Sequence, residues 1–306
     1  MKETLSIIIP VYGEKELVPI LYNRLINNLK KIPVDYNIIY INDCCPFGSG
    51  EELEKLAKID KNVKIINFTR NFGEASAVKA GIDFCNSDWA IIMDCDLQDR
   101  PEDIPLLYNK AKEGFDVVWG ERIKRKDSFF KKFCSQAFYF INNTFSEIKI
   151  NKKIGSFSII SKDVIQELKK IDTYTFNYIQ MVEYLGFKKA YIPTIKNSRE
   201  IGKSGYSFIK GTLLATKIMI SNSNKPLLIP IISSFIMFIL CFLLITMNII
   251  NTIKFDKLTF LILFLFCILF VNLSIISLYI GIILKEVLKK PKYVIKNENN
   301  INNPKF

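Results

Sequence analysis

The stretch AIIMDCDLQDRPED, residues Ala90–Asp103, decides the fold prediction because an apolar run passes directly into a group of carboxylates. The run from Ala90 to Met93 is typical of a buried strand. The carboxylates that follow it are those of Asp94, Asp96, Asp99 and Asp103. Burying an unpaired carboxylate is costly. The strand is therefore expected to end either at a solvated loop or at a site that holds a cation.

Apolar strands and amphipathic helices alternate on both sides of this stretch. Strands are expected at 5–12, 36–43, 63–68, 89–94 and 116–120, and helices at 16–31, 50–58, 74–84 and 104–113. This alternation predicts an α/β fold with a mostly parallel sheet that helices cover on both faces. Ligands of such sheets bind beyond the carboxyl ends of the strands.

Polar side chains follow the expected strands at these carboxyl ends. They belong to Tyr12, Glu14, Asp43, Arg70, Asn71, Asp94, Asp96 and Arg122. Solvated loops alone explain such a gathering poorly, so the sequence predicts a binding site at this edge of the sheet.

The acidic segment after the fourth strand suits a divalent cation. Residues two apart in an extended backbone face the same side, so Asp94, Asp96 and Gln98 are expected to converge. Neighbouring carboxylates repel each other unless a cation neutralises them, and Mg²⁺ or Mn²⁺ prefers oxygen ligands. The alternative is a solvated surface loop, because an Asp-x-Asp pair also arises by chance.

The chain contains no glycine-rich phosphate-binding motif of the GxxxxGK[ST] or GxGxxG type. Gly48 and Gly50 are expected to form a turn that leads into a helix. Phosphate groups then depend on the metal and on cationic side chains, for which the candidates are Arg122, Arg125, Arg199 and Lys203. Arg122 is favoured because it follows a strand and because arginine matches the geometry of a diphosphate.

The composition of the 306 residues excludes several classes of chemistry. The chain has no histidine, which excludes imidazole bases, Ser-His triads and His-ligated metals. Its seven cysteines form no CxxC pair, which disfavours zinc and suits reduced thiols in the cytosol. The net charge of +12 suits nucleic acid, an anionic membrane or a phosphorylated substrate. No nucleic-acid motif is present, so no nucleic-acid partner is expected.

Two long apolar segments, 227–250 and 258–284, contain no charged residue, and each exceeds the roughly 20 residues that span a bilayer. A pair of buried core helices is the alternative. The short linker 251–257 predicts a hairpin with both ends on one side. The lysines that flank it place those ends in the cytosol and suit anionic headgroups; they are Lys225, Lys285, Lys289, Lys290, Lys292 and Lys296.

These segments predict five regions along the chain. They are a cytosolic α/β domain at 1–200, an amphipathic juxtamembrane segment at 201–225, transmembrane helices at 226–251 and 258–284, and a basic cytosolic tail at 285–306. The segment 204–220 lies either in the headgroup zone or against the domain. The Asn-rich residues 297–306 are expected to be disordered.

Six segments of the sequence, taken together, resemble the motifs of a known protein family. The segments are SIIIPVYGEKE, IND, FTRNFGEASAVKAGID, MDCDLQDRPED, DVVWGERIKR and YIGIILKEVLKKPKYVI. The chain resembles a bacterial family 2 glycosyltransferase, and more narrowly the membrane-anchored polyprenyl-phosphate glycosyltransferases, whose relatives include dolichol-phosphate mannose synthase. This resemblance implies a Rossmann-like GT-A domain, a two-helix transmembrane hairpin, and an inverting transfer of one sugar from a nucleotide-sugar to a lipid phosphate.

The resemblance also implies a role for each matching residue. Binding of the nucleotide-sugar falls to Pro10, Tyr12, Glu14, Ile41, Asp43, Asp94, Cys95, Arg122, Arg199 and Lys203. Asp96 and Gln98 hold the metal, and the catalytic set is Asp94, Asp96 and Arg122. The chain departs from the family pattern at Cys44 and Cys45, at Glu74, at 156–158 and at Gly205.

A phosphate acceptor suits a chain without histidine, because its oxygen is already anionic and attacks without a general base. The expected partners are a UDP- or GDP-linked sugar, polyprenyl (undecaprenyl) phosphate and the lipid bilayer, and a homo-oligomer is left open. The expected location is the inner (plasma) membrane, with several passes and a cytosolic catalytic domain.

Two other functions stay open on the sequence. One is a glycosyltransferase that uses a glycan hydroxyl, with Asp99 or Glu183 as the base. The other is a non-catalytic membrane scaffold with a decayed site. Binding of a nucleotide-sugar with and without Mn²⁺ separates the scaffold from both enzymes.

Overall fold

The computed structural model describes residues 2–13, 15–122, 151, 153–173, 176–195, 228–249 and 255–300. The described residues fall into two compact units. The α/β unit comprises those within 2–122, 151–195 and 291–300, and the helical unit comprises those within 228–290.

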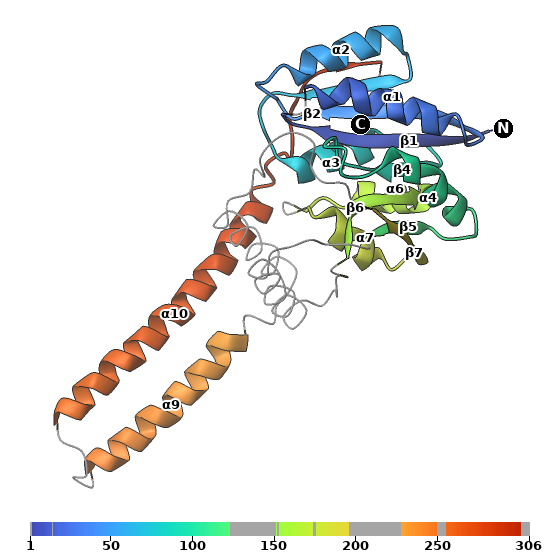
Figure 1. Ribbon diagram of the computed structural model, residues 1–306. Coiled ribbons are helices and arrows are strands. Elements are labelled where there is room, and N and C mark those ends of the chain that lie inside the picture. Colours follow the sequence, from blue (N-terminus) through green and yellow to red (C-terminus); the bar gives the residue numbers. More distant parts are fainter. Residues whose placement is uncertain are drawn as a thin grey trace. The chain divides into compact units, whose positions relative to one another are not determined.

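The α/β unit contains an eight-stranded sheet in the order β7-β5-β6-β4-β1-β2-β3-β8 (Figure 1). The strands are β1 (Glu3–Val11), β2 (Val34–Asn42), β3 (Val63–Phe68), β4 (Trp89–Ile92), β5 (Val117–Arg122), β6 (Ile154–Ser161), β7 (Lys189–Thr194) and β8 (Ile295–Asn299). The central strands β4, β1, β2 and β3 are parallel, as is the pair β5–β7. β6 and β8 run antiparallel to their neighbours. The predicted mostly parallel sheet is thus confirmed.

Helices pack on both faces of the sheet because side chains along β1 alternate between two apolar clusters. Leu5, Ile7 and Ile9 face the cluster that contains α1 (Leu17–Leu29), α2 (Ser49–Ile59) and α4 (Ile104–Ala111). Ile8 faces the cluster that contains α3 (Glu74–Phe84), α6 (Lys162–Lys170) and α7 (Tyr178–Leu185). A short 3₁₀ turn, η1 (Pro101–Asp103), precedes α4.

The helical unit contains α9 (Leu228–Ile249) and α10 (Phe255–Val287), which lie side by side (Figure 1). Ser233 Oγ donates a hydrogen bond to Asn272 Oδ1 at 2.7 Å and so links the two helices. By length and composition, the segment Phe264–Val287 is long and apolar enough to cross a membrane. Pro230–Leu240 is a shorter apolar helical segment.

The sequence predicted the helices and strands well as far as the fifth strand, but missed β6, α6, α7, β7 and β8. The prediction of disorder is wrong for residues 297–299, which belong to β8 and pair antiparallel with β3. The pairing satisfies the backbone N–H and C=O groups of these residues, although their Asn-rich composition is not typical of a strand.

Candidate functional site at the carboxyl edge of the sheet

Asp43 lies directly after β2 and joins the ends of β2 and β3. Its two carboxylate oxygens accept the backbone N–H groups of Phe72 at 2.6 Å and Gly73 at 2.8 Å. Gly73 is the N-cap of α3 and has φ 92°, a conformation that favours glycine. Burial raises the pKa of the Asp43 carboxyl. The two N–H hydrogen bonds lower this pKa, but the effect of burial is larger. The Asp43 carboxylate therefore fixes the β3–α3 loop.

Polar contacts also connect the loops that follow β1, β2 and β3. Asn42 Nδ2 donates to Asn67 Oδ1 at 2.8 Å, and Asn42 Oδ1 accepts the backbone N–H of Cys45 at 3.1 Å. The Sγ atom of Cys45 in turn accepts the backbone N–H of Gly13 at 3.1 Å. In this chain Cys45 therefore has a structural contact with the β1–α1 loop.

Two exposed aromatic rings stand at this edge. Tyr12 is 45% exposed and Phe47 is 63% exposed, and their rings meet edge to face with centroids 6.4 Å apart. The sequence predicted Tyr12 as a binding residue but did not single out Phe47. An aromatic residue within the predicted turn was the one feature of the sequence that pointed to it. Gly48, with φ 82°, caps α2 as the predicted turn requires.

Asp94 follows β4 and lies beside β6. Ser156 Oγ donates to Asp94 Oδ1 at 3.4 Å. The pairing of Ile92 with Ser158 explains this contact, because two further residues along these antiparallel strands bring Asp94 opposite Ser156. Ser156 belongs to a segment that the sequence flagged only as a departure from the family pattern.

Asp96 lies in a turn and not on an extended strand, which corrects the expected geometry. β4 ends at Ile92, and Leu97 has φ 59°, in the left-handed region that is unfavourable for a leucine. Asp96 Oδ1 accepts the backbone N–H of Gln98 at 3.0 Å and closes the turn. The alternation that predicted convergence of Asp94, Asp96 and Gln98 does not apply to this backbone.

The other two aspartates between β4 and α4 lie at the end of this segment, residues 93–103, which is here called the acidic loop. Asp99 and Asp103 are buried, and burial raises the pKa of the Asp103 carboxyl. The neighbouring Glu102 forms a bidentate ion pair with Arg24 of α1, at 3.0 and 2.7 Å. This ion pair attaches η1 to α1 and so fixes the end of the acidic loop.

The acidic loop offers a metal ion few ligands of its own. Over the part of the chain that the structure describes, no group of three or more His, Cys, Asp or Glu side chains is placed to hold an ion. The carboxylate of Asp96 and the amide of Gln98 are nevertheless the oxygen ligands that Mg²⁺ and Mn²⁺ use, and such ions often complete their shell with water and phosphate. The donor set therefore fits a divalent ion that binds together with a phosphorylated ligand.

The other predicted site residues divide into two groups. Pro10, Ile41 and Cys95 are in or beside the central strands, and the side chains of Ile41 and Cys95 are buried in the core, where they are not accessible to a ligand. Arg122 ends β5 at the same edge, but its side chain lies outside the described residues, as do Glu14, Arg199 and Lys203.

Glu183, predicted as an alternative base, is not at this edge. Its carboxylate forms an ion pair with Lys189. Lys189 pairs with Val117, the first residue of β5, which belongs to the amino edge of the sheet. The ion pair therefore places the Glu183 carboxylate near the amino edge of the sheet and not at the candidate site.

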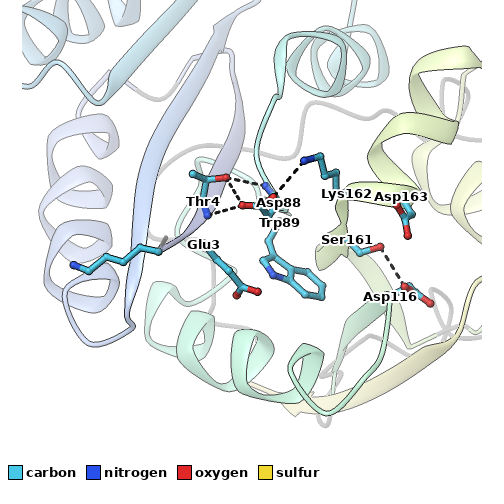
Figure 2. Close-up of a pocket in the computed structure, with 9 residues that line it drawn as sticks. Glu3, Thr4, Asp88, Trp89, Asp116, Ser161, Lys162 and Asp163 are labelled. Carbon is cyan, nitrogen blue, oxygen red and sulfur yellow. Dashed lines mark hydrogen bonds and ion pairs between the residues drawn. The ribbon is translucent and has the colours of Figure 1, made fainter.

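A cavity of about 590 Å³ lies at the amino edge (Figure 2). The Asp88 carboxylate there accepts the backbone N–H of Thr4 at 3.0 Å and the Thr4 hydroxyl at 2.8 Å, which holds the pKa of Asp88 below its usual value. These bonds join the starts of β1 and β4. None of the predicted site residues lines this cavity, so it is separate from the candidate site.

The sheet order and the polar carboxyl edge define an α/β protein of the GT-A type. The glycosyl transferase family 2 profile matches residues 6–169, and the chain belongs to this family. A bactoprenol glucosyl transferase of Shigella phage SfV is 30% identical over 96% of this chain and 98% of its own length. An uncharacterized glycosyltransferase of Bacillus subtilis is also 30% identical, over 98% of this chain and 96% of its own length.

Solved structures agree on the fold. Glucosyl-3-phosphoglycerate synthase from Mycobacterium tuberculosis, in complex with Mn²⁺, UDP and phosphoglyceric acid, superposes with a TM-score of 0.51 at 10% identity. The match covers 71% of this chain and 76% of that chain. At this identity the likeness shows the fold alone.

Proposed function

We propose that this chain transfers one sugar, with inversion, from a nucleoside-diphosphate sugar to a polyprenyl phosphate at the cytosolic face of the membrane. The observation that carries the proposal is the extent of the likeness to the phage bactoprenol glucosyl transferase, which covers 96% of this chain and 98% of that relative. The likeness therefore includes the apolar C-terminal third as well as the α/β unit.

The carboxyl edge provides the donor site in this proposal. Tyr12, Phe47 and Asp43 are proposed to bind the base and ribose, a role that the exposed ring pair and the loop held by the Asp43 carboxylate support. Asp94 is proposed to contact the donor sugar. Arg122, Arg199 and Lys203 are proposed to neutralise the donor and acceptor phosphates, which otherwise repel each other.

Asp96 and Gln98 would hold Mg²⁺ or Mn²⁺ with the diphosphate of the donor. When bound, such an ion supplies Lewis-acid stabilisation of the departing nucleoside diphosphate. The chain itself orients the two phosphates. No side chain removes a proton from the acceptor, because a lipid phosphate is anionic near neutral pH.

The helical unit provides access to the lipid. We propose that α9 and α10 form a transmembrane hairpin, with the Ser233–Asn272 hydrogen bond inside it. Their lysine-flanked ends then lie in the cytosol. This hairpin anchors the chain in the bilayer that contains the insoluble acceptor.

A matched pair of acceptors tests the proposal. The purified full-length protein is given undecaprenyl phosphate or undecaprenol, each with a panel of UDP- and GDP-sugars, and the lipids are identified by mass. The proposal expects a glycosylated lipid from the phosphate and none from the alcohol. Equal transfer to the alcohol would show a hydroxyl acceptor instead.

A further inference from the structure

We infer that the segment Pro291–Asn300, here called the C-terminal strap, positions the β3–α3 loop and thereby sets the affinity for the sugar donor. The inference rests on the proposed function, because it concerns the donor site of that reaction. The sequence predicted only a basic, partly disordered tail here. The strap instead belongs to the α/β unit, and its strand β8 forms the edge of the sheet beside β3 (Figure 1).

The strap reaches the loop through its backbone. β8 pairs with β3 from Ile65 opposite Asn299 to Phe68 opposite Ile295. Beyond β3, the backbone N–H of Thr69 donates to the carbonyl of Val294 at 3.0 Å. Thr69 begins the loop whose later residues, Phe72 and Gly73, bind Asp43. The loop is therefore held at its start by the strap and at its end by Asp43.

Tyr293 adds an aromatic contact at the same place. Its ring stacks on Phe68 with centroids 5.3 Å apart and an angle of 10° between the planes. Phe68 in turn meets Phe72 edge to face at 5.6 Å. A row of three rings thus connects the strap to the residue that donates its backbone N–H to Asp43. Moving Tyr293 changes the packing under that N–H group.

Hydrogen bonds to α3 and to the segment after α6 fix the strap. Tyr293 Oη donates to Asp83 Oδ2 at 2.9 Å, and burial together with the Asp83 charge raises the pKa of Tyr293, which keeps its hydroxyl protonated. Lys292, with a side chain only 10% exposed, pairs with Asp172 at 2.8 Å and donates to the carbonyl of Ile171 at 3.1 Å. Lys292 is thus used inside the α/β unit, which corrects its predicted role at lipid headgroups.

Asp83 also forms an ion pair with Lys79 of α3. Lys79 is buried, and burial lowers its pKa, so this cation depends on Asp83 and on the carbonyls of Leu168 and Lys169. The hydroxyl of Tyr293 therefore joins a buried charge network and does not rest on a solvated surface. Such networks hold a side chain in one arrangement.

The strap also ties the donor site to the membrane segment along the chain. α10 ends at Val287, and the strap begins at Pro291. Lys289, between them, has φ 45°, a left-handed conformation that terminates helices. The residues that leave the apolar helix are thus the residues that reach the donor loop. Protection of the β3 edge is the alternative role of an added strand.

The two ends of the strap separate these roles. Tyr293 lies at the carboxyl end of β3, whereas Asn300 Nδ2 donates to the carbonyls of Ala57 and Val63 at 3.0 Å each, at the amino end. Loss of either contact loosens the strap. Only the loss of Tyr293 affects the β3–α3 loop, which Asp43 fixes at its other end.

The experiment compares Tyr293→Ala and Tyr293→Phe with the matched control Asn300→Ala in the full-length protein. The donor KM is expected to rise about tenfold in Tyr293→Ala, with kcat and acceptor KM within about twofold. Tyr293→Phe keeps the ring stack and is expected to shift the donor KM by less than about threefold. Asn300→Ala lowers the melting temperature and leaves the donor KM unchanged.

Amide hydrogen exchange gives a readout that needs no transfer activity. Faster exchange at Phe72 and Gly73 in Tyr293→Ala, but not in Asn300→Ala, supports the inference even if the acceptor is not a lipid phosphate. Equal exchange and an unchanged donor KM in both variants would overturn it and leave the strap as edge protection. If Tyr293→Ala does not fold, Tyr293→Leu, which removes the ring stack on Phe68 but keeps an apolar side chain, replaces it in the same comparison with Asn300→Ala, with the same expected and contradicting results.

Discussion

The Asp43 carboxylate accepts the backbone N–H of Gly73 at 2.8 Å, so the end of β2 holds the first turn of α3. Its second oxygen holds Phe72 in the same way. Each carboxylate oxygen thus has one N–H donor. This one side chain fixes a loop at the centre of the candidate donor site.

Asp43→Asn is expected to weaken donor binding about tenfold, or about 1.4 kcal/mol. An amide has one oxygen that accepts a hydrogen bond and one NH₂ group that donates. One of the two backbone N–H groups of the loop would therefore face the NH₂ group and lose its hydrogen bond. Titration calorimetry with the nucleotide-sugar measures the change. The matched control is Asp35→Asn, which makes the same substitution at an exposed position near the start of β2. An equal loss in the control would contradict a specific role for Asp43.

The raised pKa of Asp43 predicts opposite effects of acid on stability and on donor binding. In the pH window between the unfolded value near 3.8 and the raised folded value, the native state binds more protons. The stability that this group contributes therefore grows as pH falls through the folded pKa and is lost as pH rises through it. Donor binding weakens over the same fall, because a protonated carboxyl accepts the two N–H groups less well.

The comparison with Asp43→Asn measures this coupling, because the asparagine does not titrate. The melting temperature of the wild type, relative to the variant, is expected to be higher at pH 4.5 than at pH 7 at constant ionic strength. The donor affinity of the wild type, relative to the variant, is expected to be lower. A difference that is flat with pH would show that Asp43 titrates at its ordinary value.

Asp96→Asn is expected to reduce transfer at least about 100-fold, in the range of other losses of electrostatic stabilisation. The reason is the loss of the carboxylate proposed to hold the divalent ion, while the amide oxygen still accepts the N–H of Gln98 and keeps the turn. Transfer rate and melting temperature are measured together. Asp163→Asn, an exposed carboxylate at the amino edge, is the control. Normal turnover by Asp96→Asn would remove the metal assignment.

Gly81→Ala is expected to destabilise the α/β unit, because α3 packs directly on the sheet at this position. A Cβ at Gly81 would lie 2.2 Å from Ile8 Cγ2 and 3.0 Å from Ile41 Cδ1. Overpacking of this kind costs about 1–3 kcal/mol. Gly281→Ala in α10 is the control, because within the described part of the chain the added carbon meets no atom within 4 Å beyond its own helix backbone and chain neighbours; it should leave the melting temperature unchanged or raise it slightly. A stable Gly81→Ala would show that α3 shifts at little cost.

The sequence predicted the first part of the fold because each strand there is a continuous apolar run bounded by polar turns. It missed the antiparallel strand β6, whose serines Ser156 and Ser158 interrupt the apolar pattern. Ser158 is buried because its hydroxyl pairs with Tyr178 at 2.7 Å, a contact between distant residues that no local pattern contains.

The sequence also missed the strap, for a different reason. The composition of β8, IKNEN, is typical of disordered chain, but its stability comes from backbone pairing with β3 and from Tyr293 on Phe68. At the site, the sequence located the acidic loop correctly and its geometry wrongly. The rule of alternation assumes an extended backbone, and the left-handed Leu97 ends that backbone.

The proposed transfer of a sugar to a lipid phosphate is tested most directly by the mass of the lipid that the purified full-length protein makes from undecaprenyl phosphate and a nucleotide-sugar. We predict a lipid phosphate that carries one sugar, formed with release of one nucleoside diphosphate and reduced at least about 100-fold in Asp96→Asn. A protein that binds a nucleotide-sugar, yet leaves undecaprenyl phosphate unmodified with every UDP- and GDP-linked donor, would contradict it.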